Sequence, residues 1–138
     1  MIAVNPYLNF NGQTEEAFTF YQSIFGGNLD MVRFGELEDT MNADKEELKR
    51  IANASLNLTG KIKLFGSDIL ESMGHQLKVG NHFYINLETE SEEETDRLFY
   101  ALSDGGEIEM PLQSTGWAKK FGMLKDKFGI QWMVYQSH

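Results

Sequence analysis

Hydrophobic and polar positions along the chain predict two similar groups of elements. Residues 2–10 form an apolar run that ends at Asn11-Gly12, which favours a strand followed by a turn. A helix is expected to begin at Thr14, where acidic residues follow, and to end at Gly26. Apolar residues recur on one face of this helix at Ala17, Phe20, Tyr21 and Ile24. Three strands are expected after it, over residues 29–34, 51–58 and 61–65.

The same order of elements returns after a loop over residues 67–80. Residues 82–87 alternate apolar and polar side chains, as a half-buried strand does. Ser91 and Glu94 form the pattern of a capping box at the start of a second helix, which Gly105 ends. Its predicted apolar face consists of Thr95, Leu98, Phe99 and Leu102. Three further strands are expected over residues 107–112, 122–124 and 131–135.

These two successive sets of a strand, a helix and three strands predict the fold class. The chain is expected to be a single α+β domain, residues 1–138, with an internal repeat of residues 1–78 and 79–138. Each half would supply one βαβββ module. Halves of this size bury too little surface to be stable alone, so they are expected to work as a pair.

Charge and composition narrow the classes of partner. The chain has 21 acidic and 12 basic residues, a net charge of −9, so it is expected to repel nucleic acid and anionic membranes. It has no cysteine, which excludes disulfides and thiol nucleophiles. Its start has no signal-peptide pattern and no apolar run is long enough to cross a bilayer. A cytoplasmic location is the expectation.

Several short motifs are more specific than this pattern of elements. In the first half they are Asn5-Pro6-Tyr7-Leu8, Phe20-Tyr21-Gln22-Ser23-Ile24-Phe25-Gly26-Gly27 and Phe65-Gly66-Ser67-Asp68. In the second half they are Met110-Pro111-Leu112-Gln113-Ser114-Thr115-Gly116-Trp117, Phe121-Gly122, Asp126, Phe128-Gly129 and Trp132-Met133-Val134. Together they resemble the PhnB-like branch of the glyoxalase/bleomycin-resistance/dioxygenase superfamily, the vicinal oxygen chelate proteins, over nearly the whole chain.

The resemblance implies an architecture and an assembly. The two βαβββ modules would form a curved, partly open mixed sheet or barrel around a cavity, and the protein would be a homodimer. The superfamily contains metal-dependent enzymes and metal-free drug-binding proteins, so the fold does not choose the activity.

Metal-using relatives place a ligand side chain at four strand positions, two in each module. Here the positions in the first and last strands fall near Pro6 and at Val134, which offer no donor side chain. Asn53 is a weak match in the first module, and only His82, in the second, matches well. No cofactor is therefore expected, and a divalent metal at His82 is the disfavoured alternative. The other histidines, His75 and His138, are expected to be bystanders.

Aromatic and polar residues on the predicted strands suggest a ligand pocket instead. Trp117 follows a Ser-Thr-Gly loop, where an indole could stack on a flat ligand; packing is the competing interpretation. His82 and Asn53 are further candidate lining residues. Alternation along a strand can aim five others at a concave face, namely Tyr7, Asn9, Phe65, Ser67 and Tyr84.

No catalytic residue can be named, since the sequence has no triad, dinucleotide or phosphate-binding motif and no glycine-rich turn for S-adenosylmethionine. The leading hypothesis is a protein that binds a small organic molecule. The alternatives are a divalent-metal lyase, isomerase or dioxygenase, and a dimeric interaction protein without small-molecule activity.

Overall fold

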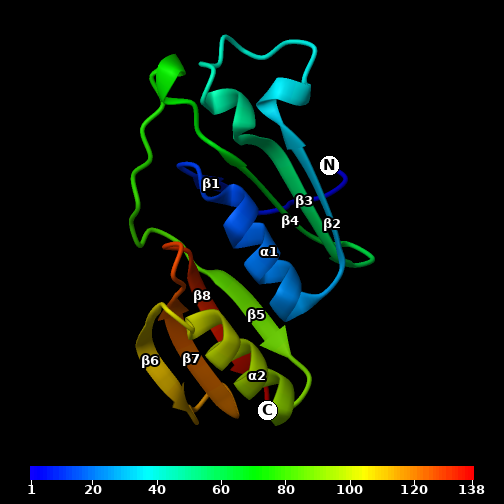
Figure 1. The fold of residues 1–138 in the computed structure, drawn as a ribbon. Helices are drawn as coiled ribbons and strands as arrows, with labels where there is room; N and C mark the ends of the chain where they lie inside the picture. Colours follow the sequence, from blue (N-terminus) through cyan, green and yellow to red (C-terminus); the bar gives the residue numbers. More distant parts are fainter. The chain divides into compact units, whose positions relative to one another are not determined.

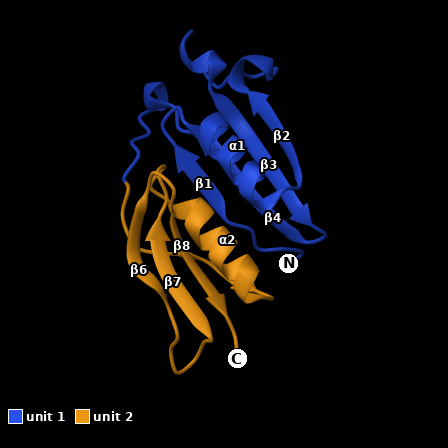
Figure 2. Ribbon diagram, turned by 60° about the horizontal axis from the view of Figure 1, so that its bottom comes forward, with its two compact units in different colours: residues 1–78 blue, residues 79–138 orange.

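The computed structural model describes residues 1–138, which divide into two compact units (Figure 2). Residues 1–78 form the first unit and residues 79–138 the second. Each unit contains a strand, a helix and three strands in that order (Figure 1). This order confirms the predicted α+β class with two βαβββ modules.

The first unit is a mixed four-stranded sheet with one helix. Its strands lie in the order β1-β4-β3-β2, and β1 is parallel to β4 while the other neighbours are antiparallel. The sheet is open, with β1 and β2 as its edges. The bounds are Tyr7–Phe10 for β1, Thr14–Phe25 for α1, Asn28–Arg33 for β2, Ile51–Thr59 for β3 and Ile62–Asp68 for β4.

The second unit repeats this topology. Its strands lie in the order β5-β8-β7-β6, again with one parallel pair, β5 and β8, and again open. The bounds are Ile85–Thr89 for β5, Glu92–Ser103 for α2, Glu107–Gln113 for β6, Lys120–Lys125 for β7 and Gln131–Gln136 for β8. Neither helix has the length and apolar character that a membrane-spanning helix requires.

The helix of each unit packs against a glycine of its sheet. Phe18 of α1 lies so close to Gly66 of β4 that an added Cβ would be 2.6 Å from the phenyl ring. In the second unit, Phe99 of α2 approaches Gly122 of β7 in the same way, also at 2.6 Å. Only a residue without a side chain lets the helix come this near to the strands. The two modules therefore share a packing device, and α1 and α2 each cover one face of one sheet.

This device explains one error in the predicted core. The sequence placed Phe20 on the buried face of the first helix, but Phe18 is fully buried and Phe20 only partly so. Gly66 opens the space that Phe18 fills, and Phe18 there makes an edge-on contact with Tyr21 at 5.7 Å between ring centroids. In the second helix the four predicted residues are all buried: Thr95, Leu98, Phe99 and Leu102.

Two strands start later than the sequence predicted. β1 begins at Tyr7 rather than residue 2, and β5 begins at Ile85 rather than at His82, which lies in a bend. The predicted capping box of α2 is present in altered form. The Ser91 hydroxyl accepts from the N–H of Glu94 at 3.1 Å, but the Glu94 carboxylate reaches the N–H of Glu90 at 2.9 Å.

Candidate functional site

The face of the first sheet opposite α1 carries the polar residues of the candidate site. In the parallel pairing of β1 with β4, Tyr7 is the register partner of Phe65, and Asn9 is the partner of Ser67. Because side chains alternate along a strand, these residues share one face, while the intervening Leu8 packs toward α1 and is buried. The alternation used to choose these candidates from the sequence therefore holds in the structure.

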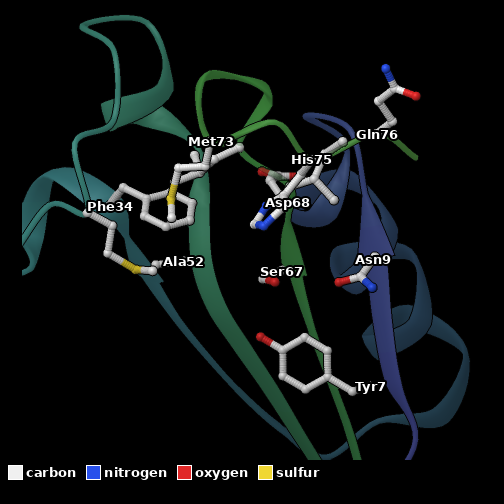
Figure 3. Close-up of a pocket in the computed structure, with 12 residues that line it drawn as sticks. Tyr7, Asn9, Phe34, Ala52, Ser67, Asp68, Met73, His75 and Gln76 are labelled. Carbon is white, nitrogen blue, oxygen red and sulfur yellow. The ribbon is translucent and has the colours of Figure 1, made fainter.

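A pocket of about 480 Å³ lies on this face, near the C-terminal end of β4. Figure 3 shows Tyr7, Asn9 and Ser67 on β1 and β4, with Phe34 and Met73 contributed by the segments that follow β2 and β4. Two kinds of surface thus meet here, one polar and one apolar. The complete lining is Tyr7, Asn9, Phe34, Met41, Ala52, Ser67, Asp68, Ile69, Leu70, Met73, His75 and Gln76.

The sequence did not single out the apolar wall or His75 as part of a site. His75 was expected to be a bystander, yet the loop after β4 brings it to the pocket. Met41 and Met73 come from segments without a regular pattern, so no periodicity could have placed them. Their proximity depends on the path of two loops, which only the folded structure shows.

A buried carboxylate ties those two loops together. Glu47 accepts hydrogen bonds from the N–H of Asp44 at 2.9 Å and from the N–H and hydroxyl of Ser72. The hydrogen bond from the Ser72 hydroxyl is the main reason why the pKa of Glu47 is lowered. Ser72 lies in the helical turn Glu71–Met73, whose last residue lines the pocket. The ionised form of Glu47 therefore stabilises the wall that carries Met73.

A second buried carboxylate, Asp68, is the last residue of β4 and also lines the pocket. Its Oδ1 accepts from the N–H of Gly12 at 2.9 Å and from the N–H and hydroxyl of Thr14 at 3.1 and 2.7 Å. Its Oδ2 accepts from the N–H of Ile51 at 2.9 Å. Asp68 thus satisfies the N–H groups of Gly12 and Thr14, at the start of α1, which would otherwise attract an anion. The side chain of Asp68 therefore occupies the anion-binding position at the turn between β1 and α1.

Five predicted lining residues lie outside this pocket, and one of them, Trp117, lines a hollow of the second unit. Phe65 shares its sheet face but does not line it, and Asn53 is exposed on β3 next to the bulge opposite β2. His82 is exposed in the bend before β5 of the second unit. Tyr84 is engaged elsewhere in that unit: its hydroxyl donates to Glu109 and accepts from the Gln131 amide, both at 3.0 Å.

The residues at the expected metal-ligand positions do not fit a metal ion. Pro6 has no donor side chain, Val134 is fully buried in the apolar core of the second unit, and His82 belongs to no group of three potential ligands. No group of three or more histidine, aspartate, glutamate or cysteine side chains has a metal-binding arrangement. We therefore derive no chemistry through a metal ion.

The second unit has a hollow of about 560 Å³ on the corresponding face of its sheet. Trp117 lies there, with its indole edge-on to the ring of Phe121 at 5.6 Å between centroids. Two thirds of Trp117 (66%) is exposed, so this residue is not part of the buried core of its unit. The complete lining is Asn86, Glu88, Trp117, Phe121, Met133, Tyr135 and Ser137.

Two βαβββ units with open mixed sheets define a protein of the glyoxalase/bleomycin resistance/dioxygenase fold. A domain of that description from Frankia sp. EAN1pec has the same fold, with a TM-score of 0.67 at 13% identity over 99% of this chain and 97% of that one. A family model described as 3-demethylubiquinone-9 3-methyltransferase matches residues 3–135, so the chain belongs to that family, the PhnB-like branch of the superfamily.

Individual relatives are similar over nearly their whole length. The chain is 32% identical to Protein YjdN of Escherichia coli, over 95% of this chain and 92% of that protein. The crystal structure of protein PA1353 from Pseudomonas aeruginosa has a TM-score of 0.90 at 36% identity, covering 99% and 98% of the two chains. A PhnB protein from Bacillus cereus has a TM-score of 0.75 at 28% identity, covering 97% and 98%.

Proposed function

We propose that the protein binds a small, uncharged organic molecule in the pocket of its first unit, without a metal ion. The observation that carries this proposal is the position of Tyr7, Asn9 and Ser67, which face one pocket from two paired strands. The pocket's volume of about 480 Å³ lies within the usual range for small-molecule sites.

The charge of the lining supports an uncharged ligand. Asp68 is buried and both of its oxygens already accept hydrogen bonds from the protein, so it has little to offer a ligand. Apart from Asp68 and His75, the lining has no acidic or basic side chain. Moving an anion from water into such a pocket would cost free energy that no lysine or arginine in the lining returns. A cation would find only Asp68, whose carboxylate already accepts hydrogen bonds from four protein donors.

The two kinds of surface indicate the shape of the ligand. Phe34, Met41 and Met73 supply an apolar, polarisable wall, on which a flat ring can pack. Across from it, the hydroxyls of Tyr7 and Ser67 and the amide of Asn9 can both donate and accept hydrogen bonds. A planar molecule with an amide-like edge satisfies both sides at once.

The family description names a methyltransferase, but the turn between β1 and α1 does not favour binding of S-adenosylmethionine, the usual methyl donor. An S-adenosylmethionine site of the common α/β type uses a free, glycine-rich strand–helix turn. In the first unit that turn is closed by Asp68, which accepts from Gly12 and Thr14. We therefore prefer ligand binding over methyl transfer.

Benzamide is a suitable probe, since it combines a flat ring with one amide. We expect calorimetric titration to show binding that EDTA does not change. Tyr7→Phe, which removes one hydroxyl, should weaken it about 5-fold, the usual value of one hydrogen bond. Tyr100→Phe is the matched control, because Tyr100 is also an exposed tyrosine but lies on α2, outside both pockets. Tighter binding of benzoate, or equal affinity of the Tyr7→Phe variant and the wild type, would contradict the proposal.

A further inference from the structure

The hollow on the second sheet differs from the first pocket in its chemistry. Its lining contains three aromatic rings and one thioether, namely Trp117, Phe121, Tyr135 and Met133. Glu88 is the one charged side chain in this lining, and no lysine or arginine lines it. The two modules therefore present surfaces of different character on corresponding faces of their sheets.

Strand register places three of the lining residues side by side. Phe121 of β7 is the partner of Tyr135 of β8, and Tyr135 is in turn the partner of Glu88 on β5. These side chains form a row across neighbouring strands on the face opposite α2. Trp117 precedes β7 and stands edge-on to Phe121, at an interplanar angle of 69°. The indole of Trp117 is mostly exposed, so much of its surface is available to a ligand.

Glu88 gives this aromatic row a negative charge. Its Oε1 accepts a hydrogen bond from the Tyr135 hydroxyl at 2.8 Å. The same hydrogen bond is the main reason why the pKa of Tyr135 is raised, so the phenol stays neutral and donates to the carboxylate. An adjoining hollow contains Glu90 and Lys119, whose charges offset each other. The local potential is therefore negative, in keeping with the net charge of −9.

We propose that this hollow is a second binding site, which takes an organic cation with an alkylammonium head group. The π faces of tryptophan, tyrosine and phenylalanine attract cations, and a quaternary or tertiary ammonium also has methyl groups that pack on them. Glu88 adds the charge that favours a cation over a neutral molecule of the same shape. Anions are disfavoured, since nothing in the lining would neutralise them.

This inference does not rest on the function proposed for the first unit. The two sites lie in different units, have different linings and call for different ligands. Failure of benzamide binding would leave the cation site intact, and failure of cation binding would leave the first pocket intact.

Choline and its uncharged isostere 3,3-dimethylbutan-1-ol provide the test, because they differ in charge and hardly in shape. Binding is followed in the isotope-labelled full-length protein through the indole N–H signal of Trp117. Trp132 is an internal reference, since it is fully buried and its indole N–H donates to Asp126. A Trp117→Phe variant assigns the two indole signals.

We expect choline to shift the Trp117 signal saturably and to bind at least about 5-fold more tightly than the isostere, as one cation–π contact predicts. Glu88→Gln keeps an acceptor for Tyr135 but removes the charge, and it should weaken choline binding several-fold. Glu93→Gln is the matched control, since Glu93 is exposed on α2, lines neither hollow of this unit, and its loss should leave the affinity unchanged. Equal affinity for choline and the isostere, no shift of Trp117, or equal effects of both glutamate variants would overturn the proposal.

Discussion

Thr14 and Asp68 lie 54 residues apart in the chain and are joined by two hydrogen bonds, from the N–H of Thr14 at 3.1 Å and from its hydroxyl at 2.7 Å. The contact fixes the start of α1 to the end of β4. It therefore holds together the two paired strands that carry Tyr7, Asn9 and Ser67.

Replacement of Asp68 by asparagine should destabilise the protein. The new amide NH₂ would face N–H groups of Gly12, Thr14 or Ile51 and leave at least one buried donor without an acceptor. We expect a loss of about 2–3 kcal/mol in the free energy of unfolding, measured in urea. Asp30→Asn, on the exposed edge strand β2, is the control and should change stability little. A loss for Asp68→Asn no larger than this control would show that the carboxylate does not organise the unit.

Trp132 and Trp117 should respond in opposite ways to substitution by phenylalanine. Trp132 is fully buried and its indole N–H donates to Asp126 at 2.9 Å, whereas Trp117 is mostly exposed. Trp132→Phe leaves a cavity and removes a donor from a buried carboxylate, so it should cost about 2–3 kcal/mol. Trp117→Phe should cost less than about 0.5 kcal/mol, as surface substitutions do. Chemical unfolding of both variants checks this, and similar losses would refute the assignment of one to the core and one to a ligand surface.

Acidification should release the contact between the two loops of the first pocket. The pKa of Glu47 is lowered in the folded state, chiefly by the Ser72 hydroxyl. A lowered pKa means that the carboxylate adds stability above its ordinary pKa and that this stability disappears as the pH falls through the lowered value.

Glu47→Gln should therefore be less stable than the wild type at neutral pH. The difference between the two proteins should shrink as the pH falls, because the wild-type carboxyl becomes protonated as well. Thermal unfolding over a series of acidic pH values measures this. Glu46→Gln, next to it and exposed, should give no pH-dependent difference. A difference for Glu47→Gln that stays constant with pH would contradict the assignment.

Alkaline titration tests the hydrogen bond between Tyr135 and Glu88 in the second unit. The pKa of Tyr135 is raised, first by its hydrogen bond to Glu88 and then by burial. A raised pKa contributes stability below the ordinary phenol value, and this stability is lost as the pH rises through the raised value. Glu88→Gln should lower the pKa of Tyr135, as read from phenolate absorbance after subtraction of a Tyr135→Phe variant. An unchanged titration curve would mean that the hydrogen bond does not form in solution.

Regular elements could be predicted from the sequence because their signals are local. Alternation along β1 and β4 placed Tyr7, Asn9 and Ser67 on one face, and the structure brings these three to one pocket. The periodicity assigned Phe20 to the buried face in place of Phe18, because the burial of Phe18 depends on Gly66, which is far away in the chain. The face of a helix that is buried is decided by the surface that it meets.

Loop contacts could not be predicted in the same way. The hydrogen bonds of Glu47 to Ser72 and of Asp68 to Thr14 join residues far apart in sequence. His82 illustrates the opposite error, because an apparent alternation extended the predicted strand through an exposed bend. The disfavoured alternative of a metal at His82 came from the family resemblance at that strand position.

The central claim is that the first unit binds an uncharged organic molecule on the open face of its sheet. The most direct test is a backbone amide chemical-shift map of the full-length protein titrated with benzamide. We predict saturable shifts confined to the lining segments, namely residues 7–9, 34, 41, 52, 67–70 and 73–76, with no change on adding EDTA. Shifts confined to residues 79–138, or no shifts up to a concentration of about 10 mM, where even weak small-molecule sites fill, would contradict it.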